Sequence, residues 1–106
     1  MKFVLISRHT NGAAIPESDR EQNLKEMGEW VGSLKAEIAM PIRGGKSVTA
    51  KKIDEYVGDI GGIIIYEAES LDQAVALAQK SPGLKFGFTH EVLPEVSMDQ
   101  ASKEKV

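Results

Sequence analysis

Three segments of the chain carry the dense apolar pattern of β-strands. Residues 2–8 are apolar at both alternating positions, which is typical of a strand buried on both faces. Residues 63–68 form the strongest run, and residues 85–93 alternate aromatic or aliphatic side chains with polar or small ones. A short further strand is predicted around residues 47–49, after a Gly-Gly turn signal.

Two helices are predicted between these strands. The first begins at a capping box of Ser18 and Glu21, whose side chains satisfy free backbone N–H groups of the first turn. The second begins at the equivalent box of Ser70 and Gln73 and is stopped by Pro82. The first helix carries an apolar stripe at intervals of three and four residues, formed by Leu24, Met27, Val31, Leu34 and Ile38, with Trp30 beside it as a core or interface residue.

The order β-α-β-β-α-β predicts an α+β fold of the ferredoxin-like sandwich type, an antiparallel sheet with both helices on one face. Two helices leave the other face bare, yet residues 2–8 and 63–68 are apolar on both faces. A second copy covering that face would make a dimeric α/β barrel with room for a small ligand. The alternative is that the C-terminal tail, residues 97–106, folds over the face of a domain formed by residues 1–96.

Composition narrows the function classes without choosing one. The chain has 106 residues, 42% of them hydrophobic, and its net charge is −3. That balance argues against a partner nucleic acid or an anionic membrane surface. The chain has no cysteine, which excludes disulfides and thiolate chemistry. No membrane span, signal peptide or cofactor motif is evident, so a cytoplasmic protein without a cofactor is expected.

Four side chains are the candidates for ligand binding: Arg8, His9, Tyr66 and His90. If the first and third strands are parallel, Arg8, His9 and Tyr66 meet at one end of the sheet. A cation, an imidazole and a phenol there would suit an anionic or aromatic small molecule. Arg8 is then either an anion clamp or the ion-pair partner of Glu67.

His9 and His90 are the only histidines. With the last strand antiparallel beside the first, His9 is predicted near Lys85 and His90 near Val4. Several residues of strand would separate the imidazoles by more than about 10 Å, which argues against a shared metal site. Either histidine could act as an acid or base if it faced the barrel interior. No nucleophile with a matched base is visible, so catalytic residues stay unassigned.

Six short segments stand out together: Met1–Ile6, Gly45–Lys46 with Val48–Thr49, Gly61–Glu67, Ser70–Ala74, Ser81–Pro82 and Glu91–Pro94. Together they resemble the YCII-related, DGPF-type proteins over roughly residues 1–96. The resemblance implies a ferredoxin-like fold that assembles as a dimeric α/β barrel. The Asp-Gly-Pro-Phe segment of that family would fall at Ala50–Ile53 and is absent. The resemblance to the YCII branch also implies a histidine in the first helix as a catalytic candidate, but no histidine occurs between Ser18 and Ile38.

Three functions are compatible with these observations. The first is a homodimer with a pocket for a small organic or anionic ligand. The second is a dimeric α/β-barrel enzyme that carries out proton transfer or isomerisation with His9 or His90. The third is a protein-interaction module. A general acid or base with a supporting partner would separate the first two. The most informative observation would be whether a polar-lined cavity exists at the subunit interface and which side chains point into it.

Overall fold

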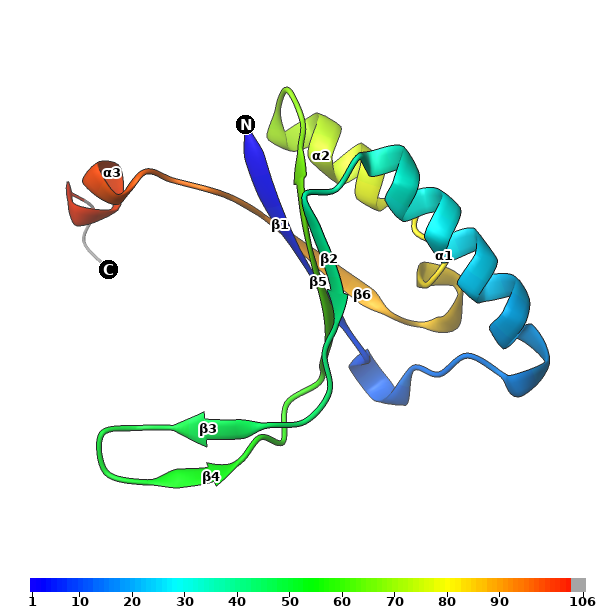
Figure 1. The fold of residues 1–106 in the computed structure, drawn as a ribbon, viewed down its shortest axis with the longest axis horizontal. Helices are drawn as coiled ribbons and strands as arrows, with labels where there is room; N and C mark the ends of the chain where they lie inside the picture. The colour runs from blue at the N-terminus through cyan, green and yellow to red at the C-terminus, as the bar shows by residue number, and fades with distance from the viewer. Residues whose placement is uncertain (104–106) are drawn as a thin grey trace.

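The computed structural model describes residues 1–103 and has a four-stranded sheet at its centre. The strand order is β2-β5-β1-β6, and every neighbouring pair is antiparallel. Two helices pack on the same side of this sheet (Figure 1). This is the predicted ferredoxin-like β-α-β-β-α-β arrangement. The elements are β1 (Lys2–Arg8), α1 (Arg20–Leu34), β2 (Ile38–Pro41), β5 (Ile60–Glu67), α2 (Leu71–Ala78) and β6 (Thr89–Pro94).

A two-stranded hairpin and a short helix stand away from this body. Strands β3 (Lys46–Val48) and β4 (Ile53–Glu55) form a separate two-stranded sheet, and α3 (Met98–Lys103) follows an extended segment after β6. Both project from the sheet on the side opposite to α1 and α2 (Figure 1). We call β3 and β4 with their connecting turn the hairpin arm.

The short strand predicted around residues 47–49 is present as β3, but it is not the second strand of the main sheet. That strand is β2. Ile38 lies opposite Ile65 of β5, whereas Val48 pairs only within the hairpin arm. Pro41 is tolerated at the end of β2 because this is an edge strand, where a missing N–H breaks no ladder bond.

The capping box predicted for the first helix is also wrong. A 3₁₀ turn at Glu17–Asp19 precedes α1, and Asp19 caps the helix without a side-chain hydrogen bond. The helix ends at Leu34 because Lys35 adopts the left-handed conformation, with φ of 52°. Ile38, the last residue of the predicted helical stripe, therefore lies in β2 and not in the helix.

The buried face of α1 is rotated relative to the predicted stripe. Leu24 is 74% exposed, while Asn23, Trp30 and Leu34 are buried. Asn23 stays satisfied because its side-chain amide donates to the carbonyl oxygen of Pro82 at 3.4 Å. In α2, by contrast, the predicted box is confirmed, since Ser70 Oγ accepts a hydrogen bond from the Gln73 backbone N–H at 3.1 Å.

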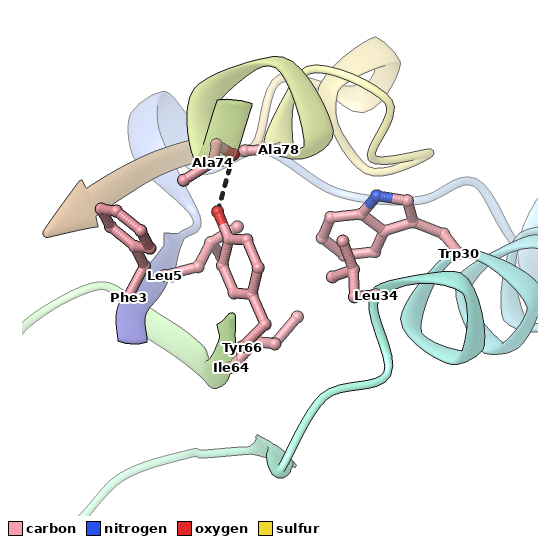
Figure 2. Close-up of a cluster of buried hydrophobic side chains, with 8 residues drawn as sticks. All are labelled: Phe3, Leu5, Trp30, Leu34, Ile64, Tyr66, Ala74 and Ala78. Atoms are coloured by element: carbon pink, nitrogen blue, oxygen red, sulfur yellow. Dashed lines mark hydrogen bonds between the residues drawn. The ribbon is translucent and has the colours of Figure 1, made fainter. Parts of the chain in front are cut away.

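The hydrophobic core lies between the sheet and the two helices (Figure 2). The Trp30 indole N–H donates to the Leu77 carbonyl oxygen at 3.0 Å, which ties α1 to α2 and confirms Trp30 as a core residue. The buried apolar side chains are Phe3 and Leu5 from β1, Ile64 and Tyr66 from β5, Trp30 and Leu34 from α1, and Ala74 and Ala78 from α2.

The opposite face of the sheet is apolar as well, as predicted. Side chains alternate along a strand, so the neighbours of the core residues point away from the helices. Met40 and Leu93 there are 47% and 45% exposed. We call this surface the open face, and its apolar side chains are Val4, Ile6, Ile38, Met40, Ile63, Ile65 and Leu93.

None of the helices within residues 1–103 has both the length and the apolar character needed to cross a membrane.

Candidate functional site

Arg8 ends β1 and is held by two carboxylates. Its Nη1 donates to Asp59 Oδ1 at 2.7 Å, and its Nε donates to the Glu91 carboxylate. These hydrogen bonds, that to Asp59 foremost, raise the pKa of the guanidinium above its ordinary value. Both bonds tie β1 to its neighbours, so the cation is already paired within the chain.

The predicted ion pair of Arg8 with Glu67 is wrong because β1 and β5 are antiparallel. Glu67 lies opposite Lys2 at the other end of the strand pair, and its carboxylate is 4.0 Å from the N-terminal amine of Met1. Arg8 itself lies opposite Ile60.

Tyr66 is part of the core and does not join Arg8 and His9. It lies opposite Phe3, is fully buried, and donates its hydroxyl to the Ala74 carbonyl oxygen at 2.7 Å. Burial raises the pKa of its phenol. At the usual rise per residue, the six positions from Ile60 to Tyr66 place this side chain about 20 Å from the Arg8 end of the sheet. The predicted convergence of the three residues is therefore wrong.

His90 lies opposite Ser7, two positions from His9, and the register predicted near Val4 is wrong. Strand β6 begins only at Thr89, because a 3₁₀ turn at Leu84–Phe86 and a left-handed Gly87 take up the preceding residues. The two histidines are thus closer in register than the sequence predicted.

The His90 imidazole faces the helices and stacks on Trp30, with ring centroids 6.0 Å apart and planes 10° apart. Its Nδ1 is 3.0 Å from the Thr89 carbonyl oxygen, while Nε2 is buried without a hydrogen-bond partner among the described residues. Burial lowers the pKa of His90, and the bond to Thr89 opposes that shift in part. The ring borders an apolar groove between α2 and β6, formed with Leu71, Val75, Ala78, Gln79, Leu84 and Val92.

His9 is exposed and held at the end of β1. Its backbone N–H donates to the Asp59 carbonyl oxygen at 2.8 Å. Its imidazole meets the edge of the Phe88 ring at 4.5 Å between centroids, with an interplanar angle of 70°. The ring also lies over Gly61, where a Cβ atom would overlap it. Gly61 is the extra residue of a β-bulge, since Ser7 pairs with Gly62 and Arg8 with Ile60.

A pocket of about 490 Å³ opens beside this imidazole, and we call it the His9 pocket. His9, Arg20 and Arg43 supply its polar groups, and none of the described side chains that line it is acidic. Neither arginine forms an ion pair within residues 1–103. Its remaining walls are apolar and come from Ala13, Ala14, Ile15 and Phe88.

The YCII-related domain family matches residues 1–94. The chain belongs to the YCII-related family. The resemblance found in its short segments is thereby confirmed. No curated protein matches this YCII-related chain.

Among the solved structures with a similar fold is one that matches this YCII-related protein over nearly its whole length. It is the 5-chloro-2-hydroxyhydroquinone dehydrochlorinase from Burkholderia phenoliruptrix AC1100 in complex with 2,5-dihydroxybenzoquinone. The two chains are 22% identical, with a TM-score of 0.60, and the match covers 94% of this chain and 98% of the other. At this identity the likeness shows the fold.

Sequence reasoning missed most of the His9 pocket in this YCII-related chain. Arg20 lies between Ser18 and Glu21 of the predicted capping box, Arg43 directly precedes the Gly-Gly turn signal, and Phe88 lies within the strand predicted over residues 85–93. The antiparallel pairing of the first and last strands is predicted, but its register is displaced. In the structure Arg8 lies opposite Thr89, which brings Phe88 beside His9. No group of three or more His, Cys, Asp or Glu side chains within residues 1–103 could hold a metal ion.

Proposed function

We propose that this YCII-related protein is a homodimer that binds a small organic molecule in the His9 pocket. The observation that carries the proposal is an exposed imidazole beside a phenyl ring, His9 against Phe88, in a cavity of about 490 Å³. Small-molecule sites usually combine such a volume with apolar walls and few polar groups.

Within this proposal the four candidate side chains have different roles. His9 faces the pocket, whereas Arg8 is paired with Asp59 and Glu91 and stabilises the sheet. Tyr66 is fully buried in the core. His90 borders the groove beside α2 and can touch a ligand there only through its exposed edge, because Nε2 is buried.

The open face supports the homodimer. An apolar surface of this extent on a soluble domain marks a contact surface. The hairpin arm supports the same conclusion, since its cross-strand pair Val48 and Ile53 is 72% and 68% exposed. An isolated two-stranded hairpin is marginally stable in water. In a symmetric dimer the arm of each copy would pack along the sheet of the other.

A second candidate is an enzyme in which His9 transfers a proton. The protein of similar fold is a dehydrochlorinase in complex with 2,5-dihydroxybenzoquinone. An imidazole exposed to a pocket can accept and return a proton near neutral pH. His9→Gln would then abolish turnover of a substrate that the variant still binds.

Two measurements test the proposal. Multi-angle light scattering at micromolar concentration should give twice the 11.5 kDa chain mass. A panel of small aromatic compounds, neutral and charged, should include members that raise the melting temperature, and His9→Gln should reduce that rise. A monomer, or a panel without effect on the wild-type protein, would overturn the corresponding half of the proposal.

A further inference from the structure

We infer that the His9 pocket selects planar organic anions, meaning a carboxylate or an acidic enol or phenol carried by a conjugated ring. This inference rests on the proposed function and names the ligand class of the same site.

The charge of the pocket is the first observation. Arg20 and Arg43 face it together with His9, and no acidic side chain among the described lining residues compensates them. The charge of Arg8, by contrast, is compensated by two carboxylates that form ion pairs with its guanidinium. A cationic pocket in a chain of net charge −3 is therefore a local feature rather than a consequence of composition.

The origin of the three basic groups is the second observation. His9 follows β1, Arg20 is the first residue of α1, and Arg43 lies in the connection after β2. Three separate segments thus place basic groups around one cavity. Guanidinium groups bind carboxylates and enolates through paired hydrogen bonds, which fixes the orientation of a planar anion.

The apolar wall of the pocket favours a ligand that carries an apolar surface as well as a negative charge. Phe88 meets the His9 ring edge-on, and Ala13, Ala14 and Ile15 complete the wall. An inorganic anion would leave this wall in contact with water. A flat conjugated ring covers it and can stack against the aromatic side chains.

The experiment compares benzoate with benzamide, its neutral counterpart of the same shape, and with inorganic phosphate. Binding is followed by calorimetry and by amide chemical shifts of the folded protein. We expect benzoate to shift the amides of His9 and Phe88 and to bind at least about tenfold more tightly than benzamide or phosphate. Raising the salt concentration should weaken benzoate binding, since salt screens exposed charges.

Arg20→Gln should weaken benzoate binding about tenfold, and Arg43→Gln should act in the same direction. The matched control is Lys25→Gln, which removes the same charge from the same helix outside the pocket and should leave the affinity unchanged. Circular dichroism confirms that each variant is folded.

Each contrary result has a defined meaning. Equal binding of benzamide and benzoate at these amides overturns the inference but leaves the proposed pocket intact. Phosphate binding as tight as benzoate also overturns it, because the ring then contributes nothing. Equal losses in Arg20→Gln and Lys25→Gln show an effect of net charge alone and overturn it as well. No binding by any probe or panel compound refutes both the inference and the ligand-binding half of the proposed function.

Discussion

The hydroxyl of Tyr66 donates a hydrogen bond to the carbonyl oxygen of Ala74 at 2.7 Å, which joins the centre of the sheet to α2 (Figure 2). Both residues are fully buried. The phenol of Tyr66, which the sequence predicts as a ligand contact, therefore stabilises α2 from within the core.

Tyr66→Phe is expected to lower the free energy of unfolding by about 1 kcal/mol, the usual contribution of one hydrogen bond. The ring would still fill its place among the core side chains. Urea denaturation followed by circular dichroism measures the change. Benzoate affinity should stay at the wild-type value, and a loss of binding without a loss of stability would place Tyr66 in the site after all.

Gly61→Ala should weaken ligand binding without removing any side chain that touches the ligand. The added methyl group overlaps the His9 imidazole, which must rotate away from its position beside Phe88. We expect a loss of affinity similar to that of His9→Gln, measured by calorimetry. If the variant binds as well as the wild-type protein, the position of the imidazole is irrelevant to recognition.

His90 should make the protein less stable in mild acid. Its folded-state pKa lies below the ordinary value of 6.5, since burial disfavours the charged ring. The unfolded chain therefore takes up a proton at a higher pH than the folded protein does. Stability from this group is complete above about pH 6.5 and falls as the pH is lowered through that value.

The measurement is the melting temperature between about pH 7.5 and about pH 5.5. His90→Phe keeps an aromatic ring against Trp30 but cannot be protonated, so its melting temperature should fall less over this interval. An equal fall in both proteins would assign the acid sensitivity to other groups.

Met40→Glu should weaken the proposed dimer by about tenfold or more, because it places a charge within an apolar contact. Leu24→Glu is the matched control, since Leu24 is also exposed but lies on α1, on the other side of the sheet. Light scattering over a dilution series reports the dissociation of each variant. Dissociation of the Leu24 variant, with Met40→Glu remaining dimeric, would move the contact to the helical face.

Arg8→Gln should lower the melting temperature by a few degrees and leave benzoate binding unchanged. Without the guanidinium, the carboxylates of Asp59 and Glu91 remain near each other with no cation between them. Adding Glu91→Gln to the same chain should restore part of the loss. Abolished benzoate binding in Arg8→Gln would return this residue to the site.

The fold could be predicted because its signals are local and repeated. Alternating apolar positions in β1 and β5 identify both faces of the sheet, and the box at Ser70 and Gln73 marks the start of α2. The start of α1 could not be predicted in this way, because a 3₁₀ turn displaces it and an acceptable capping pattern at Ser18 goes unused. The edge strand β2 was missed because its four residues form only a short apolar run.

The site was predicted only in part because it depends on strand direction. His9 lines the candidate pocket, but the prediction that places Tyr66 at the same end of the sheet assumes that β1 and β5 are parallel. Because the two strands are antiparallel, the end of β1 lies beside the start of β5, where Asp59 forms an ion pair with Arg8. Arg20 and Arg43 come from segments without periodicity, so no sequence pattern points to the cavity that they share.

The bulge at Gly61 has a consequence for how this chain can vary. It adds one residue to β5 at the boundary between the regular ladder and the segment that holds His9. Side chains in a strand alternate between the two faces of the sheet. Gaining or losing one residue at this bulge therefore turns the side chains of the preceding residues to the opposite face, while the side chains that follow keep their faces. The segment that packs against His9 can thus change its direction while Gly62–Glu67 keep their places opposite β1.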